Sequence, residues 1–269
     1  MSKYANIQWV VQRNLTEPDS LHGLESACNA IYVDYCAIDV IPFSDQLFGF
    51  PRHKKSIFYG STTTMNLIYR QQGLNQGLFF DETAFSMERY LDVWGKYMLN
   101  FGSRLIKIGD LNNLDYADDK LLFIRPNDDS KSFSGEVKKF GEIADWIKKI
   151  ALSEDMRLTA DTKILVGEPY HIKSEWRLWI VEKQVVAASK YRENFKLKKE
   201  LGCPDAVRNF AEARSIEYTP HDVFVMDIGL CGDDLYIIEC GCMNSAGFYD
   251  ADMDKIVQSV TEYFYVKHS

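Results

Sequence analysis

The sequence of 269 residues contains no long uninterrupted hydrophobic run, few prolines and glycines, and no excess of positive charge. No apolar stretch approaches the roughly 20 residues that a membrane helix needs, so we expect neither a membrane span nor a secretory signal. Seven prolines and sixteen glycines are too few for a disordered or fibrous chain. Acidic residues outnumber basic ones by 39 to 31. The chain therefore lacks the broad positive field of non-specific nucleic-acid binders, and nucleic acid is not expected as a partner.

The six cysteines include no CxxC pair, so the sequence suggests neither a redox motif nor a zinc ribbon. Cys240 and Cys242 alternate along an expected strand end, which could indicate a metal site or a redox motif. The alternative, two small packing residues, is favoured because the other cysteines and the five histidines are scattered. This cysteine usage fits a reducing cytoplasm.

The first part of the chain alternates between β-prone and helical patterns. β-prone runs cover residues 7–11, 33–41 and 56–60, and Ser20 is placed to cap a helix with apolar residues at helical spacing. Residues 61–64 can cap a second helix, and residues 85–99 predict a third. This order predicts an open α/β lobe, and the polar stretch at 110–119 suggests a boundary between residues 1–115 and 116–269.

The second part of the chain is richer in strands. Tight turns are expected at 182–183 and 232–234, each joining two β-prone runs. The predicted strands cover 121–124, 163–166, 176–181, 184–189, 223–226 and 235–238, and the predicted helices cover 137–151, 205–214 and 252–266.

Two acids near the C-terminal end carry the most chemical information. Asp227 follows the strand expected at 223–226, and Glu239 follows the strand expected at 235–238. A hairpin between these strands would bring both carboxylates to one cation. With the amide oxygen of Asn244 they would suit Mg²⁺, which prefers a few protein oxygens, waters and substrate phosphates. The alternative is that both are solvated strand-end acids, which is a common arrangement.

Two further segments could hold a nucleotide. After the strand at 121–124, Arg125 precedes a polar loop in which Ser130, Lys131 and Ser132 could cover phosphates. The loop has a single glycine, so it is no Walker loop, and an ordinary polar loop is the alternative. Residues 164–177 form a strand, a proline-stiffened connector and a second strand, in which Glu175 could accept ribose hydroxyls. The alternative here is a connector with surface charges.

The order of these segments resembles the ATP-grasp superfamily, and in particular its arginine-for-lysine clade. The resemblance is carried by residues 123–135, 175–177 and 238–249 and covers nearly the whole second part of the chain; residues 94–100 also look like that clade. It implies an α/β fold of the α+β ATP-grasp type. In that fold an N-terminal open α/β lobe precedes ATP-grasp lobes, which hold the nucleotide between two β-sheets.

The resemblance implies a role for each matching position. Arg125 stands where the family usually has a phosphate-binding lysine, and Lys190 resembles a basic residue that reaches the γ-phosphate. Glu168, Tyr170 and His171 would contact the adenine, and Glu175 would bind the ribose. Asp227 and Glu239 match the magnesium carboxylates.

Two positions depart from the family pattern. Gly241 occupies the slot of the last metal ligand, commonly an Asn, so Asn244 is the expected substitute. Val225 occupies a position where peptide-forming relatives often carry a catalytic Arg, and Arg177 or Arg192 would take its place beside Lys190.

The implied activity is an ATP- and Mg²⁺-dependent ligation of a carboxylate to an amine through an acyl phosphate. The expected partners are small-molecule or peptide acids and amines, with a protein terminus left open. Two alternatives remain at this point. One is a phosphotransferase on the same fold, and the other is a non-catalytic nucleotide-binding module, which the changes at Gly241 and Val225 would favour.

Overall fold

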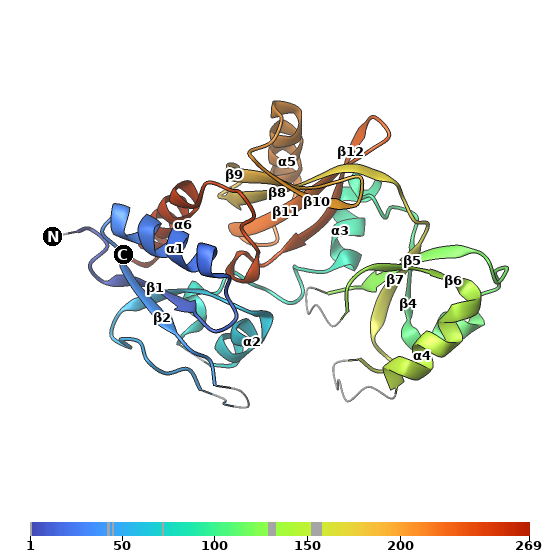
Figure 1. The fold of residues 1–269 in the computed structure, drawn as a ribbon, viewed down its shortest axis with the longest axis horizontal. Helices are drawn as coiled ribbons and strands as arrows, with labels where there is room; N and C mark the ends of the chain where they lie inside the picture. The colour runs from blue at the N-terminus through green and yellow to red at the C-terminus, as the bar shows by residue number, and fades with distance from the viewer. Residues whose placement is uncertain (1, 42–43, 45, 72, 129–132, 152–157) are drawn as a thin grey trace.

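The computed structural model describes residues 2–41, 44, 46–71, 73–128, 133–151 and 158–269, with no side-chain description for residues 150 and 151. Its three β-sheets form three regions (Figure 1). The three-stranded N-terminal sheet and the four-stranded sheet lie on opposite sides, and the five-stranded sheet lies between and above them. The mixed α/β class expected from the sequence is confirmed.

The N-terminal sheet is parallel, with the order β2-β1-β3. Its strands are β1 (Ile7–Gln12), β2 (Asp34–Ile38) and β3 (Lys55–Tyr59), as predicted. Helix α1 (Pro18–Ala30) begins before Ser20, because Pro18 occupies the first helical turn, where its fixed φ is favourable. Ser61 caps α2 (Thr62–Arg70) by accepting a hydrogen bond from the Thr64 amide.

The central sheet is antiparallel, with the order β10-β9-β8-β11-β12. Its strands are β8 (Ile172–Val181), β9 (Gln184–Glu193), β10 (Lys196–Leu201), β11 (Val223–Cys231) and β12 (Asp234–Gly241). Glu182 and Lys183 both have positive φ, so the predicted tight turn is confirmed. Strand β10 was not predicted, because its residues are all exposed and show no apolar alternation.

Helices cover both faces of the central sheet. Helices α3 (Met87–Trp94) and α5 (Asp205–Glu217) pack on one face. On the other face, α6 (Met253–His268) and α1 share one hydrophobic core with the central and N-terminal sheets. Trp179 of β8 and Trp9 of β1 both lie in this core, so buried apolar contacts hold the central sheet and the N-terminal sheet together.

The third sheet is antiparallel, with the order β4-β7-β5-β6. It consists of β4 (Arg104–Lys107), β5 (Leu121–Pro126), β6 (Glu136–Lys139) and β7 (Lys163–Gly167), and α4 (Ile143–Ala151) packs against its own core. The predicted helix at 137–151 is therefore wrong over its first residues. Residues 136–139 pair with β5 instead, because their alternation fits an edge strand.

The described residues also form five short 3₁₀ helices: η1 (Asn75–Gly77), η2 (Gly95–Tyr97), η3 (Ile108–Asn113), η4 (Phe140–Glu142) and η5 (Met243–Ser245). The predicted helix at 85–99 is shorter than expected, because Gly95 ends α3 at a positive φ of 48° and begins η2. The division between residues 115 and 116 remains a prediction, and β4, which precedes it, already pairs with β7.

All six cysteines are free thiols. In the part of the chain that the structure describes, no helix combines the length and apolarity needed to cross a bilayer.

Gly77 provides a test of how η1 packs on β3. A Cβ atom at this position would lie 1.7 Å from the backbone oxygen of Ser56, which cannot move without distorting β3. We expect Gly77→Ala to lower the free energy of unfolding by at least about 2 kcal/mol, because overpacking against backbone forces a shift. Gly247→Ala is the control, since an added Cβ meets no atom within 4 Å there. Urea unfolding of both variants measures the difference, and equal stabilities would contradict this packing.

Candidate active site

The two acids singled out in the sequence are direct cross-strand partners. Asp227 of β11 pairs with Glu239 of β12, and paired residues of antiparallel strands project from the same face of a sheet. Both line a cavity of about 400 Å³ that also receives Phe123 and Arg125 from β5 of the four-stranded sheet. The acids lie within their strands rather than at the ends, because β11 and β12 are longer than predicted. A cavity between two sheets thus contains both carboxylates.

Asp227 is held by Arg177 in a two-point ion pair. The Arg177 Nε and Nη2 atoms donate to Asp227 Oδ1 and Oδ2, each at 2.8 Å, and the Asp227 side chain is only 3% exposed. Burial works to lower the pKa of Arg177, but the charge and hydrogen bonds of Asp227 raise it well above its ordinary value. The guanidinium therefore remains charged beside the carboxylate.

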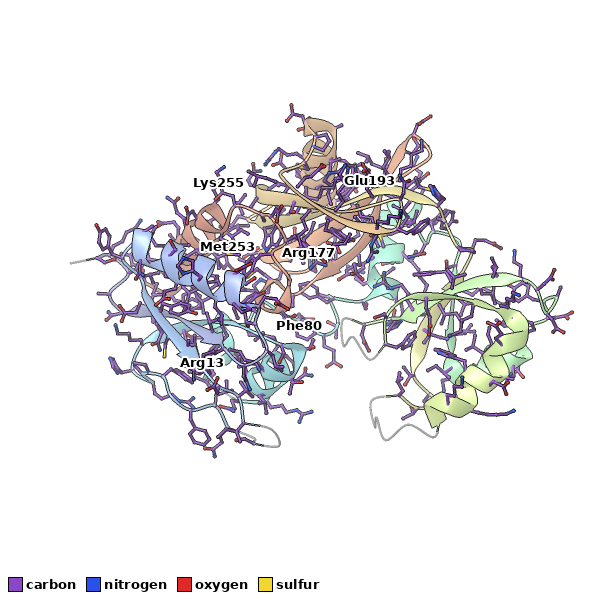
Figure 2. The ribbon with its side chains drawn as sticks, viewed as in Figure 1. Arg13, Phe80, Arg177, Glu193, Met253 and Lys255 are labelled. Carbon is purple, nitrogen blue, oxygen red and sulfur yellow. The ribbon has the colours of Figure 1, made fainter. Side chains whose placement is uncertain are left out.

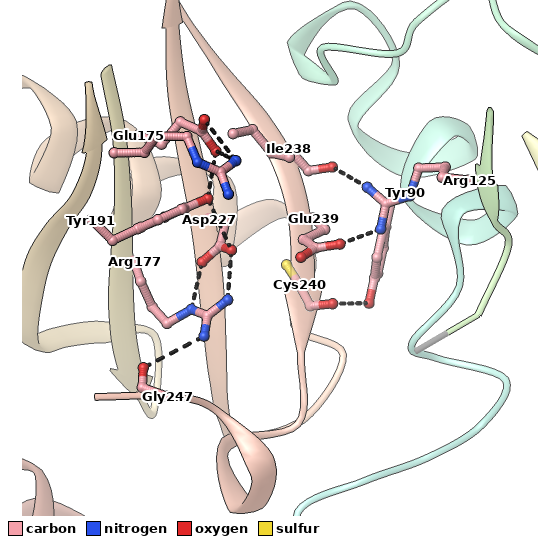
Figure 3. A network of polar contacts seen from close by, with 11 residues as sticks. Tyr90, Arg125, Glu175, Arg177, Tyr191, Asp227, Ile238, Glu239, Cys240 and Gly247 are labelled. Atoms are coloured by element: carbon pink, nitrogen blue, oxygen red, sulfur yellow. Dashed lines mark hydrogen bonds and ion pairs between the residues drawn. The ribbon is translucent and has the colours of Figure 1, made fainter. Parts of the chain in front are cut away.

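Glu239 is held by Arg125, which reaches across from the other sheet. The Arg125 Nη2 atom forms an ion pair with Glu239, and Nη1 donates to the Ile238 carbonyl oxygen at 3.2 Å (Figure 3). The Arg125 Nε atom is buried and has no partner among the described residues. This contact links the four-stranded sheet to β12 directly over the cavity.

A third acid, Glu175, forms the neighbouring part of the same network. It accepts hydrogen bonds from the Tyr191 hydroxyl at 2.7 Å and from Arg192 Nη1 at 3.1 Å. Tyr191 stacks on Tyr249 with ring centroids 4.9 Å apart. Burial first, and then the charges of Asp227 and Glu175, raise the pKa of Tyr191 well above its ordinary value, so its hydroxyl remains a donor.

Six charged side chains of the cavity form three ion pairs, and Asp128 lines the cavity as a further carboxylate. Three carboxylates, from Asp227, Glu239 and Glu175, each face one arginine, from Arg177, Arg125 and Arg192 respectively. Guanidinium groups suit phosphate oxygens, and a pair of carboxylates suits a hard divalent cation. No cluster of three or more His, Cys, Asp or Glu that could hold a metal occurs within the described residues. The donor set therefore fits a cation that takes its remaining oxygens from phosphates and water.

Comparison with known protein families identifies this arrangement. A family model described as the ATP-grasp domain of the arginine-for-lysine clade, family 2, matches residues 101–259. The chain belongs to this ATP-grasp family. The resemblance to the arginine-for-lysine clade is thereby confirmed. No curated protein matches the sequence.

Several solved structures share the fold over almost the whole chain. D-cycloserine synthetase DcsG aligns with a TM-score of 0.64 at 12% identity, covering 96% of this chain and 99% of that protein. The ATP-grasp ligase PsnB in complex with a precursor peptide and AMPPNP gives 0.56 at 11% identity, covering 96% and 98%. D-alanine–D-alanine ligase from Bacillus anthracis gives 0.52 at 10% identity, covering 98% and 97%. At these identities the likeness establishes the ATP-grasp fold.

Asn244, expected as the third metal ligand, has another position in this ATP-grasp chain. It is fully buried, and its amide nitrogen donates to the carbonyl oxygens of Phe58 at 2.6 Å and Gly77 at 2.8 Å. Its amide oxygen accepts from the Phe79 backbone N–H at 2.8 Å. The side chain thus links η5 to the N-terminal region by hydrogen bonds, and the expected role as a metal ligand does not fit this position.

Lys190, expected to reach the γ-phosphate, lies on the opposite face of the central sheet. It pairs across strands with Trp176, which belongs to the core under α3 and α5. Its ammonium group forms ion pairs with Glu193 and Glu200. Hydrogen bonds from Lys190 and Lys198 lower the pKa of Glu193 to about 2, which keeps this surface cluster ionised. The expected phosphate contact does not fit this position.

The residues expected around the adenine lie on the connector between β7 and β8. Glu168 follows β7 directly and forms an ion pair with Lys120 at 2.7 Å. Tyr170 is 40% exposed, and the His171 ring meets Phe195 edge-on. None of the three lines the cavity that contains the acids. Ser130, Lys131 and Ser132 lie outside the described residues.

Two tyrosines of the site were not foreseen. Tyr191 follows Lys190 on β9, so its side chain points to the opposite face, toward Asp227. A register shift after Lys190 then pairs Arg192 with Glu175 and leaves Tyr191 as the extra residue of a bulge. Tyr249 adopts a positive φ of 53° and stacks on Tyr191. Neither a bulge nor a positive φ at a tyrosine has a sequence signature as clear as a turn glycine.

The position of Asn244 leads to a stability prediction. Asn244→Ala removes three hydrogen bonds to buried backbone groups, so we expect the free energy of unfolding to fall by about 2–4 kcal/mol. Asn112→Ala, at an exposed asparagine, is the control and should change little. The loss should be the same in chemical unfolding with and without Mg²⁺ and AMPPNP together. A loss that appears only with both present would instead restore Asn244 as a metal ligand.

Proposed function

We propose that the protein is an ATP- and Mg²⁺-dependent ligase that joins a carboxylate to an amine through an acyl phosphate. The cross-strand pair of Asp227 and Glu239, with Arg177 and Arg125 in contact with them, is the observation that carries the proposal. Membership of the ATP-grasp family supports a nucleotide in the cavity between the sheets.

The three ion pairs of the cavity and the connector between β7 and β8 receive roles in this proposal. Asp227 and Glu239 would hold Mg²⁺, which when bound would neutralise the phosphate charge. Arg125 and Arg177 would bind phosphate oxygens, and Glu175 would bind the ribose hydroxyls beside Arg192. Glu168, Tyr170 and His171 remain proposed adenine contacts through the connector. Ser130, Lys131 and Ser132 remain proposed to cover the phosphates, whereas Lys190 has no role in the cavity.

The proposed reaction has two steps. In the first, a substrate carboxylate oxygen attacks the γ-phosphorus, the bond to the β-phosphate oxygen breaks, and ADP leaves. In the second, an amine that has lost its proton attacks the acyl carbon and phosphate leaves. Arg125 and Arg177 act in the first step by stabilising the negative charge that spreads over the transferring phosphoryl group. Excluding water from the cavity protects the acyl phosphate from hydrolysis.

The structural neighbours include enzymes for small molecules and for peptides. One is named a D-cycloserine synthetase, one a D-alanine–D-alanine ligase, and one was solved with a precursor peptide. We therefore propose a small-molecule or peptide acid and amine as substrates, with a protein terminus among the acids and amines to be tested. Six free thiols support our proposal of a reducing, cytoplasmic location.

The first test removes the two carboxylate charges. In the double variant Asp227→Asn, Glu239→Gln we expect ADP release over panels of acids and amines to fall at least about 1,000-fold, because phosphate charge is no longer neutralised. Asp233→Asn with Glu217→Gln changes exposed acids outside the cavity and serves as the control. Turnover of the cavity variant equal to that of the control would contradict the assignment.

Hydroxylamine separates the ligase from its alternatives. An acyl phosphate is trapped as a hydroxamate, which mass spectrometry detects, and we expect this product together with ADP. ADP with a phosphorylated hydroxyl compound and no hydroxamate would indicate a phosphotransferase. Nucleotide binding without any ADP would indicate a non-catalytic module.

The ion pairs also predict that metal and nucleotide bind together. Each proposed metal carboxylate is already neutralised by an arginine, so Mg²⁺ alone must compete with Arg177 and Arg125. A triphosphate offers these arginines another anion and releases both acids. We expect Mg²⁺ alone to leave the melting temperature nearly unchanged. Mg²⁺ with AMPPNP at about 100 times Kd should raise it by about 5 °C or more. An equal shift with Mg²⁺ alone would contradict this coupling.

A further inference from the structure

A second cavity, of about 300 Å³, lies beside the proposed active site. One face of α2 forms its wall, since the five lining residues Thr62, Met65, Asn66, Tyr69 and Arg70 follow the three-and-four spacing of a helix. The opposite side comes from the segment before α3 and from the loops that follow β5 and β12. The N-terminal region thus contributes most of a pocket that the metal and phosphate roles do not use.

The place of this pocket is defined by two shared residues. Cys242 lines both this pocket and a small cavity that contains Asp227 and Glu239. Asp128 lines both this pocket and the larger cavity proposed for the nucleotide. The pocket therefore adjoins the region where the proposed acyl phosphate would form.

The inner wall of the pocket is apolar and aromatic. Met65 is 5% exposed, and the rings of Tyr69 and Phe80 meet edge-on with centroids 5.9 Å apart. Phe80 stacks in turn on buried Phe85. Figure 2 shows Phe80 below Arg177, next to the N-terminal region. This wall is fixed by packing and offers an aliphatic or aromatic group a contact surface.

The pocket also contains one charge of each sign without a protein partner. Arg70 and Glu82 are exposed, and neither forms an ion pair with any described residue. This differs from the nucleotide cavity, where every arginine already faces a carboxylate. Arg70 is available to a carboxylate and Glu82 to an ammonium group.

We propose that this pocket binds the amine substrate as a single free amino acid with an apolar side chain. Arg70 binds its carboxylate, Glu82 binds its ammonium group, and the side chain packs against Met65, Tyr69 and Phe80. A volume of about 300 Å³ is at the small end of ligand pockets and suits one amino acid better than an extended peptide. This inference rests on the proposed ligase function.

The chemistry assigned to the bound amino acid is balanced. Its ammonium group loses one proton to the Glu82 carboxylate, and the free amine nitrogen then attacks the acyl carbon of the acyl phosphate. A C–N bond forms, the bond from the acyl carbon to the phosphate oxygen breaks, and phosphate leaves. The carboxylate bound by Arg70, the last residue of α2, takes part only in binding.

The test is a binding measurement on the full chain saturated with AMPPNP and Mg²⁺. Calorimetric titration should show that L-phenylalanine and L-leucine bind. Phenethylamine lacks the carboxylate and N-acetyl-L-phenylalanine lacks the ammonium group, so each should bind at least about 10-fold more weakly than L-phenylalanine. L-Aspartate and L-lysine should also bind more weakly, because their charged side chains would face the apolar wall.

Two variants assign the charges. Arg70→Gln should weaken L-phenylalanine binding at least about 10-fold and abolish its advantage over phenethylamine. Glu82→Gln should do the same relative to the N-acetyl compound. Arg104→Gln and Glu17→Gln change exposed residues outside the pocket and should leave binding unchanged.

Absence of amino acid binding to protein that does bind AMPPNP and Mg²⁺ would overturn this inference and leave the proposed function standing. Binding that is unchanged in both pocket variants would also overturn it. Loss of nucleotide binding in the unmodified protein would instead refute the proposed function itself.

Discussion

The register between β11 and β12 is the constraint on which the site depends. It places Asp227 directly opposite Glu239 on one face of the central sheet, and a shift of one residue would turn one of them into the core under α3 and α5. Arg177 on the adjacent β8 and Arg125 on the separate four-stranded sheet then meet these acids. Removing one partner of the largely buried Arg177–Asp227 pair would leave an uncompensated charge, so the two groups depend on each other.

The two arginines differ in what they link. Arg177 and Asp227 belong to neighbouring strands of one sheet, so their pair is internal to a rigid element. Arg125 joins the four-stranded sheet to the central one, so its pair with Glu239 is a polar contact between the two sheets. Leu165 of β7 adds an apolar contact, because it packs in the core under α3 and α5. In the proposed reaction, a triphosphate that takes over Arg125 would change both the charge of the cavity and the contact between its walls. The pocket of the N-terminal region adjoins these carboxylates, so three regions of the chain surround the proposed reaction centre.

Local patterns in the sequence predicted what depends on local physics. The strands around Trp9, Ile57 and Phe224, the turn at Glu182 and Lys183, and the approach of Asp227 to Glu239 follow from alternation, turn chemistry and family resemblance. The strand β10 was missed because its exposed residues have no buried face to alternate with. Asn244 and Lys190 were misplaced because sequence spacing does not tell which side of a sheet or loop a side chain occupies. The burial of Asn244 and the pairing of Lys190 with Trp176 decide that, and both depend on tertiary contacts.

The most direct test of the account is a crystal structure of the full chain with AMPPNP and Mn²⁺ in place of Mg²⁺. We expect an anomalous scattering peak between the carboxylates of Asp227 and Glu239, with Arg125 and Arg177 turned from these acids to phosphate oxygens. A metal peak elsewhere, or a bound nucleotide with both ion pairs unchanged, would contradict it.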